Sequence, residues 1–240
     1  MMKAKYMMSA LLSAMILPVT AQELPADLDV SISADVVNQY IWRGQELGNT
    51  SLQPTLGVSY KGLSLSAWGS VGLSEPKDTK EFDLTLSYTL GGFTVGVTDY
   101  WFNTGQDDPK NRYFKYGAHE TNHLFEGTVG YDFGWASVQW FTNFAGNDGV
   151  KKNGKRAYSS YAEVNVPFCF GGADWTATAG ATPYATTSYG ASGFAVINLS
   201  LRGTKTLRVS DKFSVPLFAG IAANPCSQKA YFVFGFTLQP

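Results

Sequence analysis

The 240-residue sequence is poor in charge and has few long hydrophobic runs. Charged residues make up 15 % of the chain, well below the roughly 25 % of an average soluble domain. After the first 21 positions no run of about 18 apolar residues occurs, which argues against a helical membrane protein. The formal net charge of −1 gives no reason to expect a nucleic-acid partner.

Cysteine is also scarce, since only Cys169 and Cys226 are present. A disulfide framework therefore does not hold the chain together. The strand assignment below places the two residues at opposite rims of the molecule. A disulfide needs Cα atoms within about 7 Å of each other, so we expect both cysteines to be unpaired.

Glycine and aromatic residues are plentiful, and much of the sequence alternates between apolar and small polar positions. Residues 84–97 read LTLSYTLGGFTVGV. Large apolar side chains occupy one parity on each side of Gly91-Gly92, and threonine, serine or glycine occupies the other. Because successive side chains of a strand point to opposite faces, this pattern predicts two strands joined by a tight turn.

The N-terminus has the features of a secretory signal peptide. Lys3 and Lys5 form a positive region, an apolar segment runs from Tyr6 to Leu17, and small residues precede Gln22. We therefore expect residues 1–21 to be removed and residues 22–240 to form the mature domain. A retained anchor helix is the alternative, but the apolar segment is short for a membrane span.

Beyond the signal, the alternation predicts an all-β chain of about twelve strands. The expected strands are Leu28–Arg43, Ser51–Tyr60, Leu63–Leu73, Glu81–Leu90, Phe93–Phe102, Asn122–Phe133, Trp135–Ala145, Ala157–Phe170, Ala173–Tyr184, Gly193–Thr206, Lys212–Ala223 and Lys229–Leu238. Every second connection is a short turn; these turns are Lys61-Gly62, Gly91-Gly92, Gly134, Gly171-Gly172 and Leu207–Asp211. The other connections are longer and polar, as in 74–80, 103–121 and 146–156.

Short turns at one end and long loops at the other are typical of an outer-membrane barrel. The two faces of the strands agree, because one face is aliphatic and aromatic and the other carries serine, threonine, glycine and amides with few charges. A secreted β-sandwich, the alternative, would place lysine and glutamate on its second face. The sequence therefore predicts a transmembrane antiparallel up-and-down β-barrel with apolar side chains outside and a moist interior.

Aromatic residues cluster near the expected strand ends, as they do at membrane interfaces. Tyr40, Trp42, Trp101 and Phe102 lie near the loop end, and Trp135, Phe168 and Trp175 lie beside short turns. Two places break the alternation. Asp99 shares the parity of the apolar face, which predicts a bulge or a position beyond the hydrocarbon. The apolar set Ala195, Ile197, Leu199 and Leu201 is interrupted by Phe194 and Val196 on the other parity.

Residues 33–54 read SADVVNQYIWRGQELGNTSLQP, and here the sequence resembles the TorF family of porins from Gram-negative outer membranes. First strands of that family typically end in Tyr, an aromatic residue and Arg-Gly, matched by Tyr40, Trp42, Arg43 and Gly44. The stretches GVTDYWF at 96–102 and AYFVFGFTL at 230–238 are also similar, particularly to members from Bacteroides-like bacteria.

The resemblance runs over most of the mature chain. It implies a barrel with a pore, and it supplies no substrate and no catalytic residues. The chain departs from the usual barrel pattern at its end, because assembly signals usually finish on an aromatic residue and this chain finishes on Gln239-Pro240. Phe236 and Leu238 would then carry the assembly signal.

Signals for catalysis and for metal binding are weak. The two histidines, His119 and His123, are four residues apart with Glu120 between them, a spacing that suits a metal site on a helix better than at the end of a strand. A barrel lipase would need a serine–histidine pair held by a third group, and no serine is singled out as a partner of His123. We expect no catalytic residue, no metal and no cofactor.

Parity places charged and aromatic side chains on the inner face, where they would line a pore. The candidates are Asp35, Arg43, Trp68, Asp83, Glu126, Phe141, Tyr161, Glu163 and Arg202, with Tyr100 also pointing inward. Barrels of about eight strands are filled by side chains and those of about sixteen leave a channel. Acidic residues outnumber basic ones in this set, and rings of charge select ions. The sequence thus predicts a narrow pore with a mild cation preference, and a salt-bridge network that fills the lumen is the alternative.

The expected location is the outer membrane, and the expected activity is passage of small solutes or ions. Expected partners are outer-membrane lipid, lipopolysaccharide, periplasmic chaperones and the barrel-assembly machinery. Loops 103–121 and 146–156 are candidates for folding inward as a constriction. The basic run Lys151–Arg156 is either a solvated loop or a contact for anionic lipopolysaccharide head groups. Two other functions stay open: a closed structural or adhesion barrel, and a lipid-modifying enzyme of the outer membrane.

Overall fold

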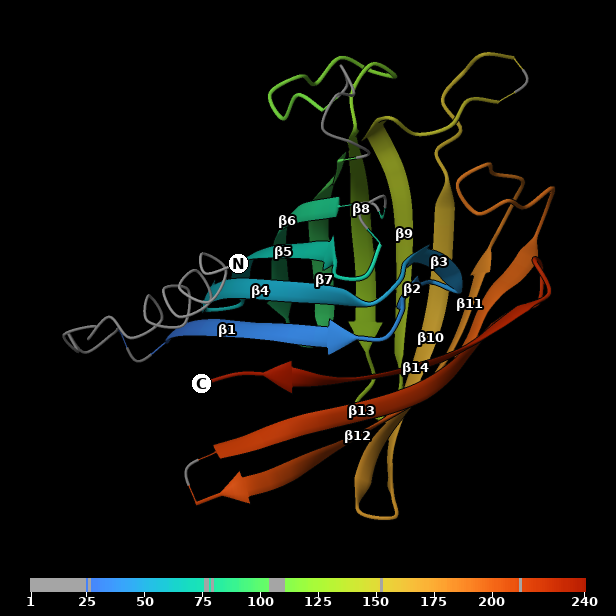
Figure 1. Ribbon diagram of the computed structural model, residues 1–240. Coiled ribbons are helices and arrows are strands. Elements are labelled where there is room, and N and C mark those ends of the chain that lie inside the picture. Colours follow the sequence, from blue (N-terminus) through green and yellow to red (C-terminus); the bar gives the residue numbers. More distant parts are fainter. Residues whose placement is uncertain are drawn as a thin grey trace, which may run out of the picture.

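In the computed structural model the chain forms a closed antiparallel β-barrel (Figure 1). The structure describes residues 25, 27–75, 78, 80–103, 111–151, 153–211 and 213–240. The signal peptide expected over residues 1–21 lies outside this range. The described part of the chain contains no helix that is long and apolar enough to cross a membrane.

Twelve of the described strands close the barrel, each antiparallel to its neighbours. They are β1 (Leu28–Val37), β4 (Ser51–Tyr60), β5 (Leu63–Gly72), β6 (Lys80–Leu90), β7 (Phe93–Asn103), β8 (His123–Asp132), β9 (Ser137–Gly146), β10 (Ser160–Phe170), β11 (Ala173–Thr182), β12 (Ala195–Ser210), β13 (Phe213–Asn224) and β14 (Lys229–Leu238). Two short strands, β2 (Tyr40–Trp42) and β3 (Gln45–Gly48), pair only with each other. The predicted fold class is confirmed.

Most strand boundaries agree with the prediction, and two differ in a way that matters. The first strand ends at Val37 rather than at Arg43, because the chain then leaves the barrel wall to form the β2–β3 hairpin. The strand expected to end at Thr206 continues to Ser210, so the connection to β13 is a tight turn rather than the five-residue stretch 207–211. The longer β12–β13 pair extends past its neighbours at the short-turn end (Figure 1).

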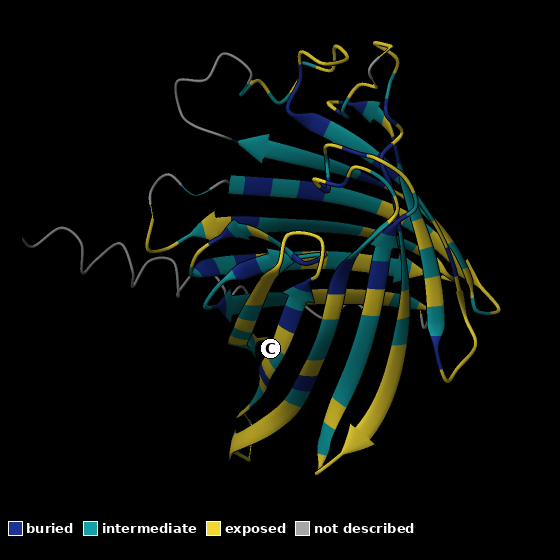
Figure 2. Cartoon of the chain, turned by 90° about the vertical axis from the view of Figure 1, so that its right-hand side faces the viewer, coloured by how far each residue is buried: buried dark blue, intermediate teal, exposed yellow. Residues whose placement is uncertain are grey.

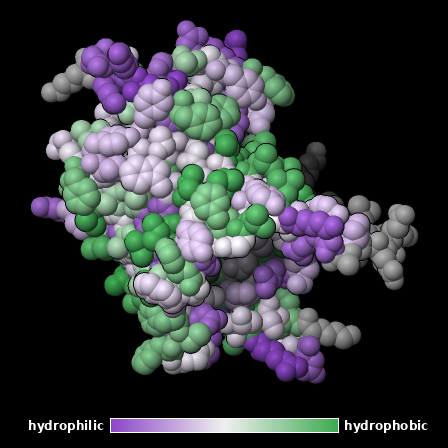
Figure 3. Space-filling model, turned by 180° about the vertical axis from the view of Figure 1, so that it is seen from behind, coloured by the Kyte–Doolittle hydropathy of each residue, from purple (hydrophilic) through white to green (hydrophobic). Residues whose placement is uncertain are grey.

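Large apolar side chains face outward along the barrel strands. Aliphatic and aromatic residues that are well exposed include Val30, Ile32, Leu56, Leu65, Leu86, Val97, Val129, Trp140, Leu199, Ile221, Phe232 and Phe234. Exposed and buried positions alternate along individual strands (Figure 2). Hydrophobic side chains spread over the centre and the lower left of the face in Figure 3, and hydrophilic ones lie at its upper end and at its right and lower-right edges. This arrangement matches the predicted orientation, and a hydrocarbon solvent favours it.

A β-bulge at Ile197 explains the broken alternation in β12. The pairing with β11 runs through Gly180–Asn198 and then shifts to Ala181–Val196, so Ile197 is an extra residue. After the bulge Leu199 points outward, whereas Ile197 itself is fully buried inside the barrel. The expectation that Ile197 lies on the apolar outer face is therefore wrong, because one inserted residue reverses the parity of a strand.

Asp99 does face outward, and no bulge accompanies it, since the β6–β7 pairing is continuous through Leu84–Asp99. A carboxylate oxygen of Asp99 lies 2.7 Å from Nδ1 of His123, which faces the same way on β8. The outer side of this pair is covered by the loop before β8. The carbonyl oxygen of Tyr113 lies 2.6 Å from Nε2 of His123, and the Tyr116 ring packs on the imidazole. The polar pair is thus satisfied without entering the lumen.

The seam between β1 and β14 closes the barrel with only four residue pairs, from Ala34–Leu238 to Val37–Gly235. The side chain of Asn38 lengthens this seam. Its Nδ2 donates to the carbonyl of Phe232 at 3.0 Å, and its Oδ1 accepts from the backbone N–H of Phe234 at 2.7 Å. An amide side chain thus replaces backbone groups at the point where the chain turns inward.

Candidate functional site in the barrel lumen

The β2–β3 hairpin, Tyr40–Gly48, lies inside the barrel, and we call it the lumen hairpin. Its turn residues Arg43 and Gly44 both have positive φ, 49° and 72°, as a two-residue type I′ turn requires. The tip contacts the wall closely. A Cβ on Gly44 would lie 1.9 Å from the carbonyl oxygen of Ile197, and Asn224 Nδ2 donates to the Gly44 carbonyl at 3.1 Å. Glycine is therefore needed both for the turn and for the approach.

The Arg43 guanidinium is held on its edges by hydrogen bonds. Nη1 and Nη2 donate to the two carboxylate oxygens of Glu126 on β8, at 2.7 and 2.9 Å. Nη1 also donates to the hydroxyl of Tyr189, at 2.7 Å. The side chains of Arg43 and Glu126 are only 7 % and 1 % exposed. This planar two-point pairing is the geometry that suits arginine rather than lysine.

Aromatic rings cover the faces of the same guanidinium. Its central carbon lies 4.2 Å from the ring centroid of Trp42, 4.0 Å from that of Phe141 and 4.6 Å from that of Tyr161. Phe141 lies on β9 and Tyr161 on β10. These distances are within the range of cation–π attraction. We call the wall residues Glu126, Phe141 and Tyr161, together with the loop residue Tyr189, the guanidinium cage.

Neighbouring residues hold Glu126 and Tyr161 in place independently of Arg43. The Tyr100 hydroxyl donates to Glu126 Oε1 at 2.9 Å. Tyr161 donates to Glu163 at 2.9 Å and accepts from Asn198 at 3.2 Å. Tyr161 lies flat on the wall because its neighbour on β11 is Gly180, where a Cβ would lie 1.9 Å from the phenol oxygen.

Tyr189 reaches the lumen from the loop between β11 and β12. It is 5 % exposed and packs against Tyr161 and Trp42. Burial raises the pKa of Tyr189 to about 12. The phenol therefore stays neutral at ordinary pH, and its oxygen accepts the bond from Arg43.

The other aromatic residues of the lumen hairpin also point inward. The Tyr40 hydroxyl donates to Glu81 at 2.9 Å, and its ring packs on Trp68. Trp42 packs edge-on against Tyr100. The expectation that Tyr40 and Trp42 belong to an interfacial girdle is therefore wrong, because the strand that would carry them outward ends at Val37.

The predicted inner-face residues fall into two groups. The first group belongs to the lumen hairpin or lies next to it. Its members are Arg43, Trp68, Asp83, Glu126, Phe141, Tyr161 and Glu163. Asp83 is 7 % exposed, and its Oδ1 has no hydrogen-bond partner among the described residues. Together with Glu81, which the sequence did not single out, Asp83 adds a buried carboxyl group beside the hairpin.

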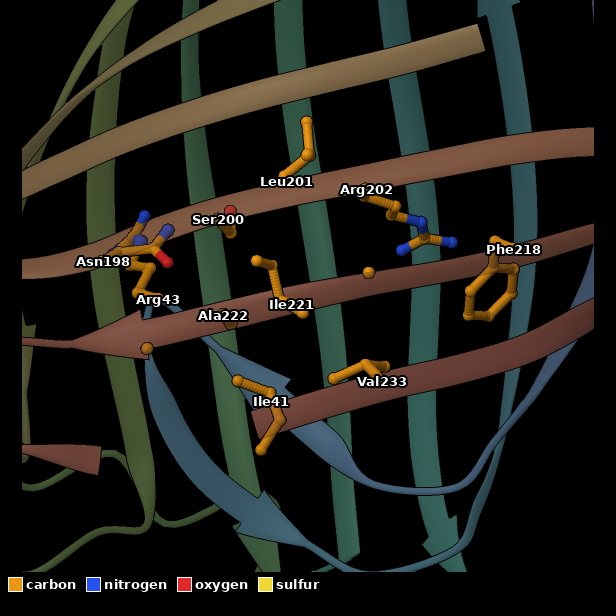
Figure 4. A pocket seen from close by; sticks show the side chains of 12 residues that line it. Ile41, Arg43, Asn198, Ser200, Leu201, Arg202, Phe218, Ile221, Ala222 and Val233 are labelled. Carbon is orange, nitrogen blue, oxygen red and sulfur yellow. The ribbon is translucent and has the colours of Figure 1, made fainter. Parts of the chain in front are cut away.

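The second group is the Arg202–Asp35 pair, farther from the loops. The closest nitrogen–oxygen distance is 4.0 Å, and the guanidinium lies 3.8 Å from the Phe218 ring centroid. A cavity of about 150 Å³ lies between the lumen hairpin and β12–β14, with Arg43 at one end and Arg202 at the other (Figure 4). Ser200 and Asn198 also line it. The cavity has a mixed lining, in which Arg43, Asn198, Ser200 and Arg202 are the polar members.

In their described residues, the loops predicted to constrict the lumen contact the outer wall or themselves. Of 103–121, residues 104–110 lie outside the described range, and Tyr113 packs on the outward-facing Phe82 and Trp101. Loop 146–156 folds on itself at the rim through the Val150–Arg156 bridge. The constriction comes instead from the lumen hairpin and from Tyr189.

Chemistry at the histidines is limited by their contacts. Both ring nitrogens of His123 face acceptors, so neither is free to bind a metal or to act as a general base. His119 is exposed in the loop. No group of three or more potential metal ligands occurs in the part of the chain that the structure describes. Cys169 and Cys226 are both free and exposed.

No family model and no curated protein matches this sequence. Among solved structures, the chain is similar to an outer membrane channel from Pseudomonas putida F1, with 13 % identity over 92 % of this chain and 98 % of that one, at a TM-score of 0.39. It is also similar to the outer membrane protein OpdK from Pseudomonas aeruginosa, with 15 % identity over 91 % and 68 % of the two chains and a TM-score of 0.37. A BenF-like porin from Pseudomonas fluorescens Pf-5 is similar at 9 % identity over 91 % and 65 %, with a TM-score of 0.33. Similarity at this level assigns no family.

Proposed function

We propose that the protein is an outer-membrane channel for small solutes or ions, and that the lumen hairpin narrows its passage. The observation that carries the proposal is a closed barrel with large apolar side chains outside and polar side chains inside. A bilayer tolerates strands only in such a closed form. The same proposal includes export through a signal peptide over residues 1–21. It also includes contact with lipopolysaccharide and delivery by chaperones and the barrel-assembly machinery.

An excess of acidic over basic side chains around the lumen hairpin supports a mild preference for cations. Glu81, Asp83, Glu126 and Glu163 lie near the hairpin, and Arg43 is the cation that the described structure places among them. Fixed negative charge in a narrow lumen attracts cations and repels anions. The stretch that carries the resemblance to the TorF family, Tyr40 to Gly44, forms the first strand and the turn of the lumen hairpin, and we include membership of that family in the proposal.

Single-channel recording and liposome swelling with sized sugars and amino acids test the channel. The informative variant joins Asn38 to Thr50 through an Asn-Gly turn and so removes residues 39–49. We expect higher conductance and passage of larger solutes, because the wall pairing between β1 and β4 does not include these residues. The matched control replaces residues 151–155, in a loop at the same rim, by the same turn, and should conduct like the wild type.

A closed structural or adhesion barrel is the second candidate, and the dense packing around Arg43 favours it. It predicts no conductance from the wild type and none from the variant lacking residues 39–49. That result would reject the channel. A preference for anions would reject the proposed cation preference but not the proposal that the protein is a channel. The enzyme alternative gains nothing from His123, whose ring nitrogens are both engaged.

A further inference from the structure

The contacts of Arg43 are those of a ligand in a binding site. One carboxylate pairs with two of its nitrogens, a phenol oxygen accepts a third bond, and aromatic rings cover its faces. Protein sites that recognise free guanidinium groups need the same combination of planar hydrogen bonding and cation–π contact. Here the ligand belongs to the chain itself.

Three of the four cage residues do not depend on the lumen hairpin for their position, whereas Tyr189 contacts the hairpin through Arg43 and Trp42. Glu126, Phe141 and Tyr161 come from three consecutive wall strands, β8, β9 and β10. Tyr100 orients Glu126, and Asn198 and Glu163 orient Tyr161. If the hairpin moves, these residues remain paired with the wall, and an acidic site lined by aromatic rings is left exposed to the lumen.

We propose that the guanidinium cage is a binding site for solutes that carry a guanidinium group, and that Arg43 is its built-in competitor. This inference rests on the proposed channel and names a class of solute for it. A neutral ureido group of the same shape lacks the charge that Glu126 and the rings recognise. A lysine ammonium keeps the charge and lacks the planar pair of donors.

Competition between Arg43 and an added solute for the guanidinium cage sets the apparent affinity of that solute. A tethered competitor acts at an effective concentration in the millimolar range or above. The apparent dissociation constant is the intrinsic one divided by the fraction of molecules with an empty cage. Removing the Arg43 side chain should therefore strengthen binding of an added guanidinium compound by about tenfold or more.

The test is binding to the full-length folded protein in detergent, measured as the rise of its thermal unfolding midpoint and as a change in tryptophan fluorescence. L-Arginine is the probe, and L-citrulline and L-lysine are the comparisons. We expect Arg43→Ala to respond to millimolar arginine, to respond little to citrulline, and to respond at a lower concentration than the wild type. Adding Glu126→Gln to Arg43→Ala should abolish the response.

Equal responses to arginine and citrulline, or a response that survives Glu126→Gln, would overturn the inference. If Arg43→Ala fails to fold, Arg43→Lys decides the matter, because it keeps a cation in the cage and lacks the planar fork. Arginine should then bind to Arg43→Lys at lower concentration than to the wild type, and an unchanged or weaker response overturns the inference. Binding in detergent needs no flux. A barrel that binds arginine and passes no solute would reject the channel alone.

Discussion

Arg43 and Glu126 meet across the lumen through two parallel hydrogen bonds, although the lumen hairpin leaves the wall between β1 and β4 and Glu126 lies four strands from β4. Both side chains are buried. Removing one partner of such a pair leaves a buried charge without compensation. The pair therefore links the position of the hairpin to the stability of the whole barrel.

Arg43→Ala should lower the free energy of unfolding by about 3–5 kcal/mol, the range measured when one member of a buried ion pair is removed. Urea unfolding in detergent micelles, followed by tryptophan fluorescence, measures the change. Lys61→Ala is the control, because the Lys61–Asp27 pair is about 60 % exposed on both sides and should contribute roughly 0–1 kcal/mol. Equal losses in the two variants would contradict the structural role given to Arg43.

Gly44→Ala should weaken the attachment of the lumen hairpin more than Gly154→Ala does. Both glycines have positive φ, 72° and 76°, so both substitutions carry the same backbone strain, about 1–2 kcal/mol. Only at Gly44 would the new Cβ also collide with a backbone carbonyl. Proteolysis of the folded barrel at the hairpin measures the difference, and matching rates for the two variants would refute the close approach.

Gly180→Ala should displace Tyr161 and loosen the cage. The added Cβ would overlap the phenol ring, whereas a Cβ on Gly193 would meet no heavy atom within 4 Å. Gly193→Ala is thus the control. We expect Gly180→Ala to raise single-channel conductance and to lower the thermal midpoint, and Gly193→Ala to change neither. A conductance unchanged by Gly180→Ala would show that Tyr161 does not limit the passage.

Asn38→Ala should weaken the seam that closes the barrel. It removes two hydrogen bonds between the Asn38 side chain and β14, each contributing about 0.5–1.5 kcal/mol. Heat-modifiability on gels and urea unfolding report the loss. Asn49→Ala is a comparison, since the exposed Asn49 side chain bonds, among the described residues, to the half-buried Asp78 near the loop end. The seam model fails if Asn38→Ala is no less stable than Asn49→Ala.

The two cysteines allow a test of topology without new labels. Cys226 lies in the tight turn between β13 and β14 on the long-loop side, and Cys169 lies beside the short turn after β10. In intact cells a membrane-impermeant maleimide should modify Cys226 and spare Cys169, and lysis should expose both. Labelling of Cys169 alone in intact cells would mean that the barrel is inserted the other way round.

The period-two alternation made most of the wall predictable. A strand with one face toward lipid and one toward the lumen carries apolar residues on one parity and small polar residues on the other. Asp99 and Ile197 show the limit of this argument. Parity correctly placed Asp99 on the outer face. It could not indicate that His123 on another strand pairs with Asp99, or that the loop before β8 shields this pair. Parity misplaced Ile197, because one extra residue reverses the pattern without any change in composition.

The lumen hairpin was not predictable from the same pattern. Tyr40, Trp42 and Arg43 keep the parities of β1, and the single breaks at Asn38 and Ile41 do not by themselves mark the point at which the chain leaves the wall. The Arg43-Gly44 pair was the available clue, since a residue followed by glycine suits a two-residue hairpin turn. Arg43 and Glu126 were both placed on the inner face, but their pairing depends on a path through space that parity does not record.

The lumen hairpin is also a detour between neighbours, because β1 and β4 pair with each other down to Val37–Ser51, the residues at which the detour begins and ends. Apart from the bonds of Asn38 to β14, the strand pairing of the ring does not include the inserted segment. Such a segment is free to change length, composition or position over evolutionary time while the cylinder around it stays intact. The same barrel wall is therefore compatible with an open pore, with a pore that a movable hairpin narrows, and with a closed lumen.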